Sequence, residues 1–181
     1  MPQSAVQCAA AVVAPRRFRL PDGRELLVRR VEARDVALER AFLARLDQEG
    51  HAYCFLGLIK ESDDEVAREL IAVDPDCEVS LIALLHEDGT DIEVGLARLR
   101  GYGDGSSADC AVAVDPEWRR GGVGSRLLQR LVDVARERGV RRLFAADGIH
   151  GNAAHRFAER HGFRSCADPD DPAAVILERE L

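Results

Sequence analysis

A glycine-rich turn flanked by arginines is the stretch whose residue types point most directly to chemistry. It follows an apolar run at 108–114 and precedes a segment at 123–138 whose apolar residues recur at helical spacing. Glycines leave backbone N–H groups uncovered, and the first N–H groups of a helix together carry about half a positive charge. The pattern predicts an anion site that suits a pyrophosphate, although the same glycines are typical of a purely structural turn. The residues of this turn are Arg119, Arg120, Gly121, Gly122, Val123, Gly124 and Ser125.

Two nucleotide-containing ligands are consistent with this turn. A dinucleotide fingerprint, G-x-G-x-x-G, would use Gly122 and Gly124 as its first two glycines, but Leu127 stands in the third position. Asp147, near the end of the next expected strand, would then hold the ribose. That fingerprint needs a βαβ unit, whereas the strands before the turn are predicted to form an antiparallel meander. The other ligand is an acyl-CoA, whose pyrophosphate needs the same N–H groups.

The elements that must position the turn are predicted from apolar spacing and from turn residues. The order is mixed α/β, with an antiparallel meander followed by a β-α-β-α segment. We expect one domain over 18–181 after a flexible N-terminal tail at 1–17. The expected elements are a hairpin at 18–31, helices at 35–49, 62–72, 123–138 and 152–161, and strands at 77–85, 92–100, 108–114, 140–146, 163 and 175–181.

Three motifs make this sequence similar to a known family. The pattern R-x-x-G-x-G at 119–124 resembles the pyrophosphate loop of the GNAT superfamily of N-acetyltransferases. The segment V-D-P-E-W at 114–118 resembles that family's lead-in to the loop, and Asn152 followed by Gly162-Phe163 resembles its last helix. Within the superfamily, the chain looks most like the GNAT domain of Pat-type protein lysine acetyltransferases.

This resemblance implies both a fold and a co-substrate. The fold is an α/β (α+β), GNAT-like twisted mixed β-sheet that is splayed between its fourth and fifth strands, and acetyl-CoA lies in the split. The pantetheine pairs with the fourth strand as an added strand would, the pyrophosphate takes the N–H groups of the turn, and Asn152 contacts the pantetheine. No metal is implied. The residues that the resemblance assigns to acetyl-CoA are Val112, Ala113, Val114, Arg119, Arg120, Gly121, Gly122, Val123, Gly124, Ser125 and Asn152.

Acetyl transfer to an amine needs a base, because only the neutral amine attacks. Deprotonating a lysine with a pKa of about 10.4 costs roughly 4.6 kcal/mol at pH 7, and a carboxylate addresses that step. The Pat-type glutamate corresponds to Asp109, which is one methylene shorter, and Glu93 in the neighbouring strand is a second candidate base. On the last helix, Ala158 stands where many relatives carry a tyrosine acid, and His155 is the nearby candidate.

Composition excludes several classes of protein. The 181 residues carry 25 Lys and Arg against 32 Asp and Glu, a net charge of −7 that argues against a nucleic-acid partner. No apolar run approaches the roughly 18 residues of a membrane span, so no membrane partner is expected. The 5 cysteines are widely spaced and odd in number, which is typical of reduced thiols and predicts a cytoplasmic protein.

The hypothesis from sequence is an acetyl-CoA-dependent N-acetyltransferase whose acceptor is a protein lysine in preference to a small amine. The alternative is a catalytically weak or inactive acyl-CoA-binding sensor or regulatory domain, because neither the usual tyrosine nor the usual glutamate is present. A nucleotide-dependent oxidoreductase is a third hypothesis, and it predicts NAD binding instead. The sequence leaves the acceptor open, and it also leaves open whether the protein forms a homo-oligomer.

Overall fold

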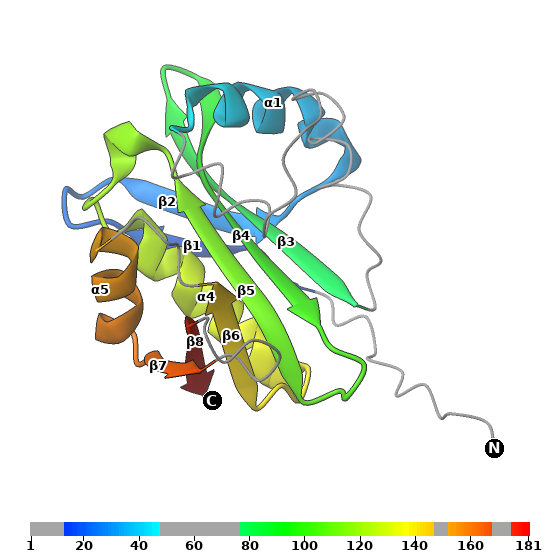
Figure 1. The fold of residues 1–181 in the computed structure, drawn as a ribbon. Helices are drawn as coiled ribbons and strands as arrows, with labels where there is room; N and C mark the ends of the chain where they lie inside the picture. The colour runs from blue at the N-terminus through cyan, green and yellow to red at the C-terminus, as the bar shows by residue number, and fades with distance from the viewer. Residues whose placement is uncertain (1–12, 48–76, 147–151, 168–174) are drawn as a thin grey trace.

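The computed structural model describes residues 13–47, 77–146, 152–167 and 175–181. Within these residues, eight strands form one mixed sheet in the order β1-β2-β3-β4-β5-β6-β8-β7 (Figure 1). Neighbouring strands are antiparallel except β5 and β6, which run parallel. The strands are β1 (Arg16–Arg19), β2 (Glu25–Arg30), β3 (Glu78–Glu87), β4 (Thr90–Gly101), β5 (Ser107–Val114), β6 (Arg142–Ala146), β7 (Arg164–Ala167) and β8 (Val175–Glu180). The predicted mixed α/β architecture is confirmed.

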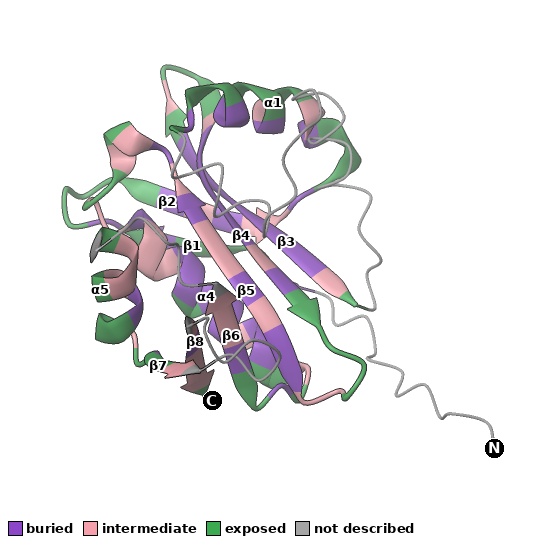
Figure 2. Cartoon of the chain, viewed as in Figure 1, coloured by how far each residue is buried: buried purple, intermediate pink, exposed green. Residues whose placement is uncertain are grey.

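Helices cover both faces of the sheet. Helix α4 (Val123–Glu137) packs under β2 to β5, while α1 (Val36–Arg45) lies on the opposite face against β4, and α5 (Asn152–Arg160) lies beside α4 (Figure 1). The predicted apolar stripe of α4 is buried, as are the strand residues that face it (Figure 2). The members of this stripe are Val123, Leu127, Leu131, Val134 and Ala135.

A close approach between α4 and the sheet depends on Gly95 of β4. A Cβ atom at this position would lie 2.7 Å from Leu127 Cδ1 and 3.1 Å from the Ala113 carbonyl oxygen. Only a glycine leaves space for the helix at that separation. The close packing fixes α4 beneath β4 and β5, and it thereby fixes where the first turn of the helix lies.

The sheet opens between β5 and β6. These strands pair only through Ser107 with Arg142, Ala108 with Leu143, and Asp109 with Phe144. Beyond Asp109, β5 continues to Val114 on β4 alone, while β6 pairs with β8. The expected split is therefore confirmed, and it lies beside the strand that was expected to pair with the pantetheine, which is β5 in this structure.

The expected boundaries differ from the structure in a few places. Helix α1 ends at Arg45 rather than at 49, because Leu46 adopts an extended backbone and its N–H donates to the Leu43 carbonyl. Strand β1 starts at Arg16, while the expected helix at 62–72 and residues 1–12 lie outside the described residues. Among the helices that the structure describes, none has the length and hydropathy to cross a membrane.

Two carboxyl side chains are enclosed between α1 and the sheet. Glu39 of α1 and Glu93 of β4 are 0% and 1% exposed, and no donor among the described residues reaches their carboxyl oxygens. Burial, with the nearby charge of Asp35, raises the pKa of Glu39 to about 7. Burial and the adjacent Glu39 raise the pKa of Glu93 well above its usual range. We conclude that the facing carboxyl groups share a proton, which supplies the missing donor.

This acid pair predicts a pH dependence of stability. The folded-state pKa of Glu39 is raised from 4.5 to about 7, so the folded protein holds a proton that the unfolded chain loses. The stability that this proton gives is complete below about pH 4.5 and is lost as the pH rises through about 7. Glu39→Gln supplies a neutral donor, and we expect it to raise the free energy of unfolding by roughly 1–3 kcal/mol at pH 8. Denaturant titrations at pH 5 and pH 8 measure the effect.

The gain should shrink at pH 5, where the wild type keeps its proton. Glu180→Gln, an exposed position at the end of β8, is the matched control and should change little at either pH. A loss of stability in Glu39→Gln that is equal at both pH values would contradict a shared proton.

Candidate active site

The loop after β5 is held in place by a buried aspartate. Asp115 is 1% exposed, and its carboxylate accepts hydrogen bonds from the Glu117 N–H at 3.0 Å and from Arg45 Nε at 2.7 Å. Its own N–H donates to the Val94 carbonyl at 3.1 Å. These bonds join α1, β4 and the loop, so the chain leaves β5 in a fixed direction towards α4.

The turn that follows aims backbone N–H groups at the open part of the sheet. Arg120 and Gly122 have φ angles of 65° and 89°, in the left-handed region that glycine adopts without strain. Gly122 is the N-cap of α4, and no side chain caps that end of the helix. The N–H groups of Val123, Gly124 and Ser125 belong to the first turn and lack intrahelical acceptors. This helix end is therefore suited to an anion.

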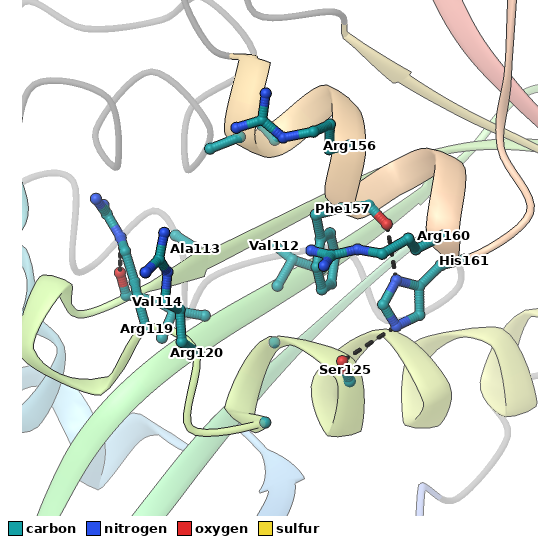
Figure 3. Close-up of a pocket in the computed structure, with 14 residues that line it drawn as sticks. Val112, Ala113, Val114, Arg119, Arg120, Ser125, Arg156, Phe157, Arg160 and His161 are labelled. Carbon is teal, nitrogen blue, oxygen red and sulfur yellow. Dashed lines mark hydrogen bonds between the residues drawn. The ribbon is translucent and has the colours of Figure 1, made fainter.

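A cavity of about 810 Å³ lies between the edge of β5, the turn and α5 (Figure 3). Of the residues predicted from sequence, it is lined by Val112, Ala113, Val114, Arg119, Arg120, Gly122, Gly124 and Ser125. Gly121 and Val123 belong to the same turn but do not line it, and the side chain of Asn152 lies outside what the structure describes. The structure thus brings most of the predicted cofactor residues together.

Helix α5 supplies the wall that sequence analysis missed. Its lining residues recur with the three- and four-residue spacing of one helix face, which is the signal that would have found them. They are Ala153, Ala154, Arg156, Phe157, Arg160 and His161. His161 joins α5 to α4, since its imidazole contacts both Phe157 and Ser125 (Figure 3).

The arginines of the cavity have different roles. Arg119 forms a two-pronged ion pair with Asp47, at 2.7 Å for each bond, and its Nε donates to the Val114 carbonyl at 3.2 Å. Its charge is therefore largely neutralised, and its side chain holds the loop. The other lining arginines have no ion pair among the described residues, and no carboxylate lines the described cavity. These arginines are Arg120, Arg156 and Arg160, and they make the cavity cationic.

The three expected catalytic residues lie apart. Asp109 is half-buried at the closed end of the split and accepts a hydrogen bond from the Tyr102 hydroxyl. Glu93 is enclosed under α1. His155 Nε2 lies 3.5 Å from Ser165 Oγ and 3.4 Å from Glu159 Oε1, on a part of α5 that does not line the cavity. Of the three, only Asp109 stands where β5 and β6 separate.

Two further positions near the split carry no acid chemistry. Ala158, at the position of the usual tyrosine, is buried in the core at 8% exposed. Cys110 is also in the core, and burial raises its pKa to about 12, so the thiol stays protonated.

Beyond Asp109, one edge of β5 has no strand partner in the described sheet, and this edge leads to the cationic N-terminus of α4. Such an edge can hydrogen-bond an extended ligand, and the helix end can hold its diphosphate. The fold and the site together define an acyl-CoA-dependent transferase on an open mixed sheet.

The chain belongs to the acetyltransferase (GNAT) family, whose sequence profile matches residues 29–163. An acetyltransferase of Pseudomonas aeruginosa is 33% identical over 157 residues, which cover 87% of this chain and 84% of that protein. The predicted similarity to the GNAT superfamily is therefore confirmed, and the chain is an acetyltransferase.

Solved structures show the same fold. The GNAT domain of S. lividans PAT superposes with a TM-score of 0.78 at 24% identity, covering 92% of this chain and 97% of that one. N-acetylglutamate synthase from Neisseria gonorrhoeae, complexed with coenzyme A and N-acetyl-glutamate, gives a TM-score of 0.59 at 25% identity, covering 86% of this chain and 35% of that one. The predicted GNAT-like fold is confirmed.

Position 124 tests the anion site. A Cβ atom on Gly124 would lie 3.4 Å from both Phe157 Cζ and Val114 Cγ2, two walls of the cavity, whereas one on Gly122 would face Pro21. We predict that Gly124→Asp weakens acetyl-CoA binding at least about a hundredfold, because juxtaposed like charges cost several kcal/mol. Gly124→Ala, which fits with ordinary contacts, should retain binding. Calorimetric titration measures both, and unchanged affinity in a folded Gly124→Asp protein would place the diphosphate elsewhere.

Proposed function

We propose that this protein transfers the acetyl group of acetyl-CoA to an amine, a protein lysine in preference to a small amine. The observation that carries the proposal is the cationic cavity where the open edge of β5 meets the first turn of α4. The coenzyme A bound to the N-acetylglutamate synthase supports the co-substrate. The preference for a protein lysine rests on the resemblance of the sequence to Pat-type protein lysine acetyltransferases.

Each part of the co-substrate has a counterpart in the site. The pantetheine extends along β5, where Val112 and Val114 have no strand partner on the β6 side among the described residues, although Arg119 Nε donates to the Val114 carbonyl. The diphosphate takes the first-turn N–H groups of α4 together with the charges of Arg120, Arg156 and Arg160. Asn152, at the start of α5, contacts the pantetheine. Fourteen residues line the described cavity, and they provide both hydrogen-bond donors and charge for this ligand.

We assign the base to Asp109. Its carboxylate takes a proton from the acceptor ammonium, directly or through one water, and the Tyr102 hydroxyl holds it in position. The amine nitrogen then attacks the thioester carbonyl carbon, whose oxygen is polarised by N–H groups of β5. The C–S bond breaks and coenzyme A leaves as a thiolate. The acetylated nitrogen then releases its second proton to solvent and the thiolate takes one up, so that a neutral amide and a thiol result. Glu93 and His155 are given no step, because Glu93 is enclosed beneath α1 and His155 lies against Ser165 and Glu159, whereas Asp109 stands where β5 and β6 separate.

A second candidate function is an acyl-CoA sensor without turnover. It is favoured by the alanine at position 158 and by the shorter carboxylate of Asp109. The two functions differ in one respect, since the sensor binds acetyl-CoA but acetylates no amine. We place either activity in the cytoplasm, because the 5 cysteines are odd in number and widely spaced, which is typical of reduced thiols.

Replacing the proposed base separates catalysis from binding. Asp109→Asn should lower kcat for lysine-containing acceptors by about 10²- to 10⁴-fold, the usual contribution of a general base, with the affinity for acetyl-CoA unchanged. Asp88→Asn, the same chemical change in the exposed β3–β4 turn, is the matched control and should keep full activity. Mass spectrometry of a panel of lysine peptides and small amines measures acetylation. Tight binding with no product from any amine would instead support the sensor.

A further inference from the structure

The histidine that follows α5 contacts the candidate diphosphate site through a serine (Figure 3). His161 Nδ1 lies 2.8 Å from the Phe157 carbonyl oxygen. Because a carbonyl can only accept, Nδ1 carries the hydrogen, and Nε2 has a free lone pair when the ring is neutral. Nε2 then accepts the hydrogen of the Ser125 hydroxyl, whose oxygen lies 3.1 Å away. The geometry thus assigns both the tautomer and the direction of this bond.

This direction matters because Ser125 is in the first turn of α4 and lines the cavity. With neutral His161, the hydroxyl hydrogen points at the imidazole, and only oxygen lone pairs are left for a ligand. Lone pairs repel a phosphate oxygen. Protonation of Nε2 reverses the bond, so that the imidazolium donates to Ser125 Oγ and the hydroxyl hydrogen is released to a phosphate.

We propose that His161 is a positioning residue of the diphosphate site, and that a bound nucleotide diphosphate and a proton on His161 stabilise each other. The inference rests on the proposed binding of coenzyme A in this cavity and specifies how it is regulated. A protonated His161 adds charge to the cavity wall and turns Ser125 into a donor. Binding therefore takes up a proton, and linkage requires that lower pH strengthens binding.

The surrounding charges explain why the proton arrives with the ligand. Arg156 and Arg160 of α5 and Arg120 of the turn line the same cavity, and Arg119 lines it while paired with Asp47. From β8, Arg179 lies beside Gly162, where a Cβ atom would be 3.6 Å from its Nε. No carboxylate lines the cavity in the part of the chain that the structure describes. A diphosphate bound beside Ser125 brings negative charge near the imidazole, and this charge favours the protonated ring.

The test uses 3′-dephospho-CoA and the whole chain. The 3′-phosphate of coenzyme A titrates near pH 6, so its removal leaves the diphosphate diester, which keeps its charge across the range tested. Calorimetric titrations between about pH 6 and pH 8, in buffers with different ionisation enthalpies, give the Kd and the number of protons taken up. We expect proton uptake by the wild type and a Kd that tightens on the order of tenfold as the pH falls, within the usual range of coupling between linked sites.

Two variants assign the effect to this pair. His161→Asn keeps a donor for the Phe157 carbonyl but has no titrating group, and Ser125→Ala removes the hydroxyl. His161→Asn should bind with a Kd that changes little with pH and without proton uptake. Ser125→Ala should take up fewer protons and show a weaker pH dependence than the wild type, because only the charge of His161 remains. His86→Asn, at an exposed histidine paired with Asp91, is the control and should keep the wild-type behaviour.

The outcomes separate this inference from the proposed function. If the wild type binds, and if His161→Asn and Ser125→Ala both keep its pH dependence and its proton uptake, the role of His161 is overturned. The coenzyme A site is left intact by that result. If His161→Asn fails to fold, Ser125→Ala gives the same decision. No binding by folded wild-type protein at any pH would overturn the proposed function, and the role of His161 with it.

Discussion

The structure depends on the early end of the pairing between β5 and β6. Three residue pairs join the two strands, and from Asp109 onward β5 has one edge without a strand partner in the described sheet. Backbone groups on such an edge need hydrogen bonds, and we propose that the pantetheine of acetyl-CoA supplies them. Helix α4 begins beside the same edge because Gly95 lets it pack against β4. A single interruption in the sheet therefore creates both the strand edge and the anion site.

The opposite face of the sheet holds this arrangement in place. Arg45, the last residue of α1, donates to the Asp115 carboxylate at 2.7 Å and to the Glu93 carbonyl at 2.6 Å. It therefore joins α1, β4 and the loop that leads to α4. The buried Glu39–Glu93 pair lies in the same layer, between α1 and β4. The Arg45 guanidinium therefore contacts both β4, against which α1 packs, and the loop that leads to α4.

Local patterns were sufficient to predict the glycine-rich turn before α4 and the order of most described elements. The glycines and arginines at 119–125 lie within one short segment, so their spacing in the sequence is enough to identify the turn. Contacts between distant segments were not predictable. Arg119 was expected to face a phosphate, but it pairs with Asp47, 72 positions earlier. Glu93 was expected near the chemistry, but the packing of α1 encloses it. The wall formed by α5 depends on how that helix lies against α4, which no single segment specifies.

Amide hydrogen exchange, resolved by residue and measured with and without acetyl-CoA, tests the central claim most directly. The account predicts that acetyl-CoA slows exchange at the N–H groups of Val112 and Val114 on β5 and of Val123 to Ser125 in the first turn of α4. Those groups meet the ligand, whereas the hairpin of β1 and β2 should be unaffected. Binding that leaves β5 and α4 unprotected, or that protects another part of the sheet, would contradict the account.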